Sequence, residues 1–171
     1  MSEIVFNHFT HDSLVAGVHA IAEAASGWSP TLLVGVGRGG LAPAVYLSHR
    51  MSLAMVSIDH STRIAQFGEE LVAVLAQRTR EGDRLLFVED INDSGRTIGE
   101  LRAALAAQGA LSENIRFAVL LDNIRSAQRV DYAFQTLDRS ITKDWFVFPW
   151  EAVAPKAALD QDAAEVPERI A

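Results

Sequence analysis

The chain has 171 residues, 49% of them apolar, with 22 acidic and 15 basic side chains and no cysteine. This length is sufficient for one domain with its own core, and the lack of cysteine excludes disulfides, thiolate metal sites and a cysteine nucleophile. A net charge of −7, scattered basic residues, short apolar runs and an N-terminus without a signal-peptide pattern predict a cytoplasmic protein with no nucleic-acid or membrane partner.

The first half of the chain alternates between helical and strand patterns. Apolar residues such as Leu14, Val18 and Ile21 recur every three or four positions, as in an amphipathic helix, whereas continuous apolar runs are typical of strands buried on both faces. The expected elements are a helix over 10–25, a strand over 31–37, a helix over 41–51 and a strand over 53–59. Residues 60–83 are ambiguous, because 71–75 fits a helix or a strand and the polar remainder suggests an excursion from the core.

The second half continues this alternation and then changes. The expected elements are a strand over 84–90, a helix over 97–108 that Gly109 ends, and a strand over 116–121. Alternation of this kind predicts an α/β fold with a parallel twisted sheet flanked by helices. The aromatic-rich segments 130–136 and 145–150 are expected to form a small C-terminal hood over the sheet, and residues 152–171 a flexible acidic tail.

The first of two unusual loops follows the predicted strand over 31–37. Its sequence, Gly35-Val-Gly-Arg-Gly-Gly40, lets backbone N–H groups approach an anion closely at the start of the next helix. Arg38 adds a planar set of donors that suits phosphate oxygens. An ordinary strand–helix turn with a surface arginine is the alternative interpretation.

The second loop joins the strand over 84–90 to the helix over 97–108. Two adjacent carboxylates, Glu89 and Asp90, end the strand, where they suit sugar hydroxyls or a divalent ion. Residues 93–97 (Asp-Ser-Gly-Arg-Thr) then combine hydroxyls, a glycine and the N–H groups of a helix start, which suits a phosphomonoester. A capped helix with Ser94 as its cap is the alternative, but capping does not explain the two strand-end acids.

These motifs resemble those of a known family. Val88-Glu-Asp-Ile-Asn-Asp-Ser-Gly-Arg-Thr97 resembles the phosphoribosyl-pyrophosphate (PRPP) motif of type I phosphoribosyltransferases. Gly37-Arg-Gly-Gly-Leu41 is similar to the pyrophosphate loop of that family, and Asp144-Trp-Phe-Val-Phe-Pro-Trp-Glu151 is similar to the base-binding hood of its xanthine–guanine and hypoxanthine branch. The resemblance covers roughly residues 30–151.

The resemblance implies a Mg²⁺-dependent enzyme of purine salvage that transfers a phosphoribosyl group from PRPP to guanine, hypoxanthine or xanthine. Asp93 would then handle the proton of the base nitrogen, Trp145 would stack on the base, and the backbone of Phe146 would read its edge. The implied PRPP-binding residues are Arg38, Gly39, Glu89, Asp90, Ser94, Gly95, Arg96 and Thr97. The implied metal ligands are Asp90 and Glu151.

The resemblance also implies how the chain is organised. The expected boundaries are 1–151 for the phosphoribosyltransferase domain, about 122–151 for its hood and about 60–83 for a mobile catalytic lid. Members of the family usually pair beside the active site, so a homodimer with a contact along the helix over 41–51 is expected. A cis peptide bond is expected between Gly37 and Arg38.

One position departs from the family pattern. In 6-oxopurine enzymes of this family a lysine soon after the fourth strand donates to the purine O6, whereas Asp122 stands there in this chain and accepts. Asp122 is therefore a candidate base-binding residue or a solvated strand-end acid, and Arg125 is expected to compensate for the lysine. Two alternatives stay open: a PRPP-dependent transferase for a base that is not a 6-oxopurine, and a non-catalytic regulator that senses PRPP or nucleotides.

Overall fold

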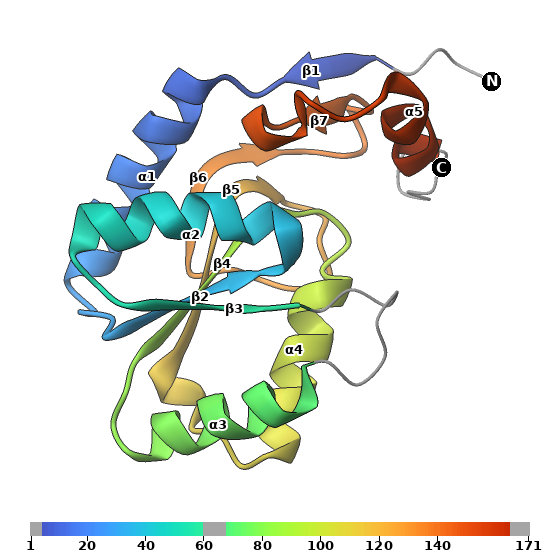
Figure 1. Ribbon diagram of the computed structural model, residues 1–171. Helices are drawn as coiled ribbons and strands as arrows, with labels where there is room; N and C mark the ends of the chain where they lie inside the picture. Colours follow the sequence, from blue (N-terminus) through green and yellow to red (C-terminus); the bar gives the residue numbers. More distant parts are fainter. Residues whose placement is uncertain (1–4, 60–67, 165–171) are drawn as a thin grey trace.

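The computed structural model describes residues 5–59 and 68–164. In chain order, the strands of its central sheet are β2 (Leu32–Val36), β3 (Met55–Ile58), β4 (Leu85–Asn92), β5 (Ile115–Asn123) and β6 (Tyr132–Leu137). All neighbouring strands are parallel, and the strand order is β3-β2-β4-β5-β6 (Figure 1). The predicted α/β class with a parallel sheet is confirmed.

Helices cover both faces of this sheet (Figure 1). On one face lie α1 (His11–Ser26) and α2 (Gly37–Met51), and on the other lie α3 (Glu69–Arg80) and α4 (Arg96–Ala107). Because side chains alternate along a strand, β5 contributes Ala118 and Leu120 to the core under α1 and α2, and Phe117 and Val119 to the core under α3 and α4.

The ends of two helices follow the local signals of the sequence. The Thr10 hydroxyl oxygen accepts a hydrogen bond from the Ser13 N–H at 3.0 Å, which caps α1. After α4 the chain turns through Gly109, whose φ of +72° lies in the left-handed region. Both helices therefore start and stop within about two residues of the predicted boundaries.

The ambiguous segment over 60–83 is in part a core helix. The structure assigns residues 69–80 to α3, which places Val72, Leu75 and Ala76 in the core against the sheet. The expected excursion is wrong for this part, because its apolar spacing is that of a helix with one buried face. Residues 60–67, where the rest of the expected lid falls, lie outside the described residues.

The expected hood also changes in extent. Residues 132–137 form β6, which pairs with β5 in parallel, so that Val119 lies opposite Ala133. This segment therefore belongs to the edge of the central sheet and not to the hood. Half-buried and exposed residues alternate over its first four positions, as they do in a strand with one covered face.

The hood itself is a second, two-stranded parallel sheet of β1 (Phe6–His8) and β7 (Trp145–Val147). The sequence did not predict β1. The Phe9 N–H donates to the Val147 carbonyl at 2.9 Å, and the rings of Phe9 and Phe148 lie 5.2 Å apart. Residues from the two ends of the described chain thus form one hood.

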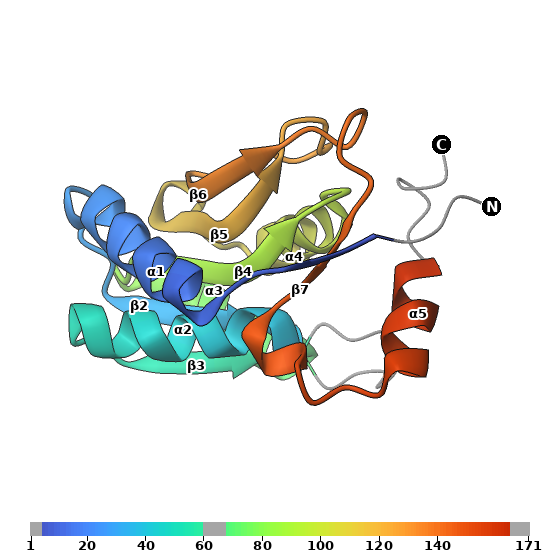
Figure 2. The same ribbon diagram turned by 90° about the horizontal axis from the view of Figure 1, so that it is seen from above.

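The chain after the hood is ordered for a further stretch. A short 3₁₀ helix (Pro149–Glu151) leads to α5 (Lys156–Ala164). Figure 1 shows β1, β7 and α5 together at the top of the molecule, and in the view from above α5 lies at its right-hand edge (Figure 2). The Lys156 ammonium lies 5.9 Å from the centre of the Phe6 ring, and Ala163 is buried. The expected flexible tail is therefore wrong for residues 156–164, while 165–171 lie outside the described residues.

Candidate active site

Two cavities, of about 830 and 920 Å³, open at the carboxyl ends of β2 and β4, and both are lined by Asp90 and Glu151. Ligands of open parallel sheets bind at this edge, where the loops after the strands converge. The first cavity is lined by Asp93, Ser94, Gly95, Arg96, Trp145 and Phe146, among others. The second is lined by Arg38, Gly39, Glu89 and Thr97, among others.

The first glycine loop forms the start of α2. This helix begins at Gly37, four residues before the predicted start, and no side chain caps its first turn. A Cβ atom on Gly40 would lie 2.0 Å from the Val88 carbonyl oxygen, and one on Gly39 would lie 2.2 Å from a carboxylate oxygen of Asp90. The glycines therefore let the N-terminus of α2 lie directly against the end of β4. The uncapped N–H groups and Arg38 give the α2 end of the second cavity the character of an anion site, beside the acids that line the rest of it.

The predicted cis peptide bond in this loop is absent. The described residues contain no cis peptide bond, so Gly37 and Arg38 are joined in trans.

The second loop, after β4, forms the start of α4. Gly95 has a φ of +86°, and the Ser94 carbonyl accepts a hydrogen bond from the Ala127 N–H at 3.1 Å. The Arg96 N–H donates to the Ser94 hydroxyl oxygen at 3.2 Å. Residues 94–96 thus present a glycine, a hydroxyl and a helix N-terminus to the first cavity, a set that suits a phosphate group.

Three carboxyl groups crowd the junction of the two cavities. Burial raises the pKa of Asp90 to about 7, and the nearby Glu151 adds to this effect. Burial and the charge of Asp90 raise the pKa of Glu89 well above its ordinary value. Burial also raises the pKa of Glu151, whose Oε2 accepts a hydrogen bond from the Phe148 N–H at 2.9 Å. Negative charge here is unfavourable, so the junction suits a cation or hydroxyl donors.

These acids do not form a complete metal site by themselves. Among the described residues, no group of three or more His, Cys, Asp or Glu side chains is arranged to hold a metal ion. Asp90 and Glu151 interact electrostatically, and both line both cavities. A divalent ion bound between the molecules in the two cavities would therefore lie next to these two carboxyl groups. Mg²⁺ commonly takes one or two protein carboxylates and completes its shell with water and substrate oxygens.

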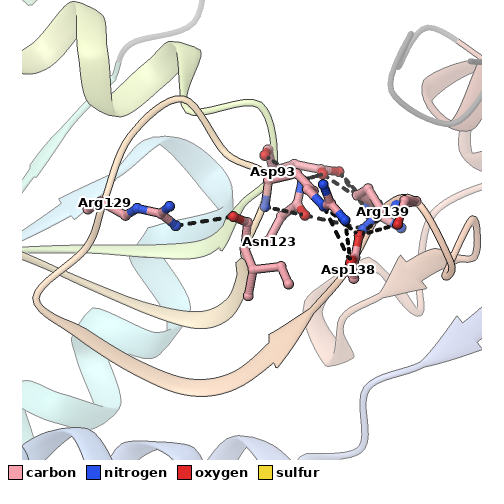
Figure 3. A network of polar contacts seen from close by, with 8 residues as sticks. Asp93, Asn123, Arg129, Asp138 and Arg139 are labelled. Atoms are coloured by element: carbon pink, nitrogen blue, oxygen red, sulfur yellow. Dashed lines mark hydrogen bonds and ion pairs between the residues drawn. The ribbon is translucent and has the colours of Figure 1, made fainter.

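Asp93 forms a buried ion pair with Arg139, a residue that the sequence analysis did not select. Arg139 Nε lies 2.9 Å from Asp93 Oδ1, and Nη2 lies 2.8 Å from Asp93 Oδ2. The Arg139 side chain is 5% exposed and the Asp93 side chain 18%. Figure 3 shows the two side chains facing each other beside Asn123, whose amide donates to the Asp93 carbonyl at 3.0 Å. Hydrogen bonds to its carboxylate and to its backbone carbonyl therefore hold Asp93 in place.

Aromatic side chains form the opposite part of the first cavity. Trp145, Phe146 and Phe148 line it from the hood side. The Arg139 guanidinium carbon lies 5.5 Å from the centre of the Phe146 ring, so the ion pair is also in contact with the hood. A flat heterocycle would find stacking surfaces and polar groups in the same cavity.

Asp122 and Arg125 lie elsewhere. Asp122 Oδ1 accepts a hydrogen bond from the buried Asn92 amide at 2.7 Å, and Asp122 lines neither cavity. Arg125 is 62% exposed, binds Asp138 at 3.1 Å, and lines a third cavity of about 520 Å³, which adjoins the first because Asp93 and Arg139 line both. The expected compensation by Arg125 is not what the structure shows, since Arg139 occupies the wall of the first cavity.

Residues 11–155 match the family model described as the phosphoribosyl transferase domain. The chain belongs to the phosphoribosyltransferase family. The two glycine loops and the acidic strand end all lie within the matched region, and the chain is an enzyme of this class.

Relatives agree with this assignment. A xanthine-guanine phosphoribosyltransferase from Cereibacter sphaeroides is 25% identical over 154 residues, which cover 84% of this chain and 86% of that protein. The crystal structure of a purine phosphoribosyltransferase from Pyrococcus horikoshii Ot3 matches with a TM-score of 0.68 and 26% identity, over 88% of this chain and 97% of that one. The recognition of a type I phosphoribosyltransferase most similar to the purine branch is confirmed.

A third structure shows how far the fold extends. The Helicobacter pylori xanthine-guanine-hypoxanthine phosphoribosyltransferase matches with a TM-score of 0.65 over 93% of this chain and 99% of that one, at 16% identity. At this identity the likeness concerns the fold alone.

In the part of this chain that the structure describes, no helix has the length and apolar character needed to cross a membrane.

Proposed function

We propose that this phosphoribosyltransferase uses PRPP and a 6-oxopurine base, namely guanine, hypoxanthine or xanthine, to make a nucleoside monophosphate and pyrophosphate. The observation that carries the proposal is the pair of cavities that meet at Asp90 and Glu151. One offers aromatic rings and a carboxylate, which suit a heterocyclic base, and the other offers Arg38 beside a helix N-terminus, which suits pyrophosphate. A ribose at the junction would reach both partners of its C1 carbon.

The ribose phosphate would lie along the loop after β4. Residues 94–96 line the first cavity and would bind the 5′-phosphate, while Thr97, which lines the second cavity, would act from the other side of the same loop. Glu89 and Asp90 would accept hydrogen bonds from the ribose hydroxyls, because burial favours partners that donate protons to these acids. Gly39 leaves the space beside Asp90 that such contacts require.

The reaction exchanges one bond at C1 for another. The bond from C1 to the pyrophosphate oxygen breaks and its electron pair leaves with pyrophosphate, while a nitrogen of the base forms the new bond. The proton that the base carries on its other imidazole-ring nitrogen passes to a carboxylate oxygen of Asp93, so the nucleotide is released with a neutral base. Arg38 and the first amides of α2 stabilise the charge on the departing pyrophosphate, and Trp145 orients the base and excludes water.

Magnesium is part of the proposal. Asp90 and Glu151 would hold the ion, since their carboxyl groups crowd one another at the junction where pyrophosphate and ribose oxygens would complete the shell. A bound Mg²⁺ would supply positive charge to the leaving pyrophosphate. Removal of divalent ions by a chelator is therefore expected to abolish transfer.

Assembly and location also remain proposals. The exposed apolar side chains of Leu41, Val45 and Tyr46 on α2 support a homodimer contact along that helix. A mass in solution that stays monomeric at every concentration would contradict it. A cytoplasmic location stays a prediction, and so does a role for residues 60–67 as a lid.

Two alternatives are separated by one assay. Purified protein would be given PRPP, Mg²⁺ and a panel of bases, and release of pyrophosphate would be measured. The proposal requires release with at least one 6-oxopurine; release only with other bases would favour the different transferase, and nucleotide binding without release would favour a regulator.

Asp93→Asn keeps the size of the side chain but removes its basicity, so turnover should fall by about 10²–10⁴-fold with little change in PRPP binding.

A further inference from the structure

Arg139 is the most completely bonded cation in the described part of the chain, and part of its bonding capacity is still available. Both Nη1 protons have acceptors, since Nη1 lies 3.2 Å from the Thr142 carbonyl oxygen and 2.7 Å from that of Asp144. Nε donates to Asp93, and Nη2 uses one of its two protons for the same carboxylate. A guanidinium has five N–H groups. The second Nη2 proton therefore has no partner among the described residues.

The position of this donor is well determined. The Asn123 side-chain oxygen accepts a hydrogen bond from the Arg139 N–H at 3.2 Å, while its amide bonds to the Asp93 carbonyl. The Phe146 ring lies against the guanidinium. Backbone and side chain of Arg139 are thus both held, and Arg139 lines the first cavity together with Asp93.

We infer that Arg139 determines base specificity by donating a hydrogen bond to an exocyclic oxygen of the base, beside the carboxylate of Asp93. This inference rests on the proposed function. The donor nitrogen is the one that already binds Asp93 Oδ2, so the cavity wall presents a donor directly beside an acceptor. The complementary edge of a base has a carbonyl oxygen next to a ring N–H.

A 6-oxopurine has such an edge, because its O6 lies next to N7, which carries a proton in one tautomer. A 6-aminopurine would direct an N–H group at the guanidinium, which has no acceptor. A purine without a 6-substituent would leave the buried N–H without a partner. Sites built for a hydrogen bond discriminate strongly against ligands that lack it. Arg139 therefore selects oxygen at position 6 by chemistry and not by cavity size.

Arg125 provides a matched control. It is also an arginine paired with an aspartate, Asp138, and it lies on the segment between β5 and β6. However, it is mostly exposed and does not line the first cavity. Arg125→Met removes an ion pair of similar composition, neither member of which lines the first cavity.

The experiment compares kcat/KM for guanine and for 2-aminopurine, which lacks the 6-oxygen, using PRPP and Mg²⁺. Wild-type protein should prefer guanine by roughly ten- to hundredfold, the ratio expected when one buried donor is left unpaired. Arg139→Met should lose most of this preference, with the KM for PRPP changed by less than about threefold, because the phosphate contacts come from other loops. Arg125→Met should keep the wild-type preference.

Arg139→Met leaves Asp93 buried without its partner, so its folding is checked by circular dichroism and thermal melting. Arg139→Lys keeps the charge but not the fixed geometry of the guanidinium, and it should retain part of the preference. If Arg139→Met does not fold, the wild-type and Arg139→Lys ratios decide. Equal use of guanine and 2-aminopurine by wild-type protein, or an unchanged preference in a folded Arg139→Met, would overturn the inference while leaving the transferase proposal intact. No release of pyrophosphate with any purine would overturn both.

Discussion

The two walls of the site, which the two cavities share, are built in different ways. The sheet wall, residues 37–40 and 90–99, follows β2 and β4 and is held by direct contacts between backbones and by the Asp93–Arg139 ion pair. The hood wall, residues 145–151, depends on two strands of three residues each and on ring contacts such as the 5.0 Å stack of Phe148 on Trp150. Short, partly exposed elements open locally at lower free energy than buried sheet strands. The sheet wall thus provides fixed chemistry, while the hood wall is the part able to admit a base.

The largest loss of stability is expected for Gly40→Ala in the sheet wall. Its Cβ would lie 2.0 Å from the Val88 carbonyl oxygen, a backbone atom that cannot rotate away, so α2 would have to move off β4. Unfolding in denaturant should show a loss of at least about 3 kcal/mol. Gly27→Ala is the control, because Gly27 has a φ of −64° and no atom within 4 Å of its Cβ position. An equal, small effect at both positions would contradict the close approach of α2 to β4.

A somewhat smaller loss is expected for Gly95→Ala. This position combines a φ of +86° with a Cβ that would lie 2.7 Å from both Ser126 Oγ and the Gln128 nitrogen. Backbone strain and overpacking together should reduce stability by about 2–3 kcal/mol. Gly109→Ala has similar strain, with a φ of +72°, but its nearest contact is 3.4 Å away, so it isolates the strain. If the two variants lose the same stability, the contact with residues 126–128 is unimportant.

Asp90→Asn should raise the free energy of unfolding of the ligand-free protein, in contrast to the glycine substitutions. Burial raises the pKa of Asp90 to about 7, so the folded protein binds a proton that the unfolded chain, with an ordinary value near 4, gives up earlier. Wild-type stability therefore falls as pH rises from about 4 to 7. At about 1.4 kcal/mol per pKa unit, the variant should gain up to about 4 kcal/mol well above pH 7 and nothing near pH 4. Thermal melts across this range measure it, and a gain independent of pH would disprove the cause.

The smallest effect is expected in the hood, for Lys156→Met. This change removes the ammonium from the Phe6 ring, 5.9 Å away, and from Asp160, 3.1 Å away. Global stability should fall by less than about 1 kcal/mol, because both contacts are exposed. Hydrogen exchange at residues 6–8 should nevertheless become faster. Asp160→Asn removes only the ion pair and should leave exchange unchanged; faster exchange in both would assign the effect to the ion pair.

Local patterns were sufficient to predict most of the sheet wall. The strands before both loops are uninterrupted apolar runs, and the structure buries every residue of β2. Glycines, hydroxyls and acids at the strand ends are chemical signals that neighbouring residues carry by themselves. Asp93, Ser94, Gly95 and Arg96 consequently line one cavity, as the motif predicts.

The hood wall was beyond local patterns. β1 has three residues, too few for a periodicity, and it pairs with β7 about 140 positions later in the chain. Arg139 gave no signal either, because an arginine in a polar turn is usually exposed. It is buried only because Asp93, Asn123 and the carbonyl of Asp144 converge on it from three separate segments.

The sequence by itself determined the parallel α/β architecture, the two glycine loops and the chemistry of the acidic strand end, since each depends on residues that are neighbours in the chain. Only the tertiary structure decided that β1 and β7 meet in one hood, that residues 69–80 join the core, and that Arg139 lies beside Asp93 while Asp122 lies beside Asn92. The physical reason is that burial and pairing depend on which distant segments are brought together. A side chain such as Arg139 therefore acquires its partners, and its chemical role, only in the folded chain.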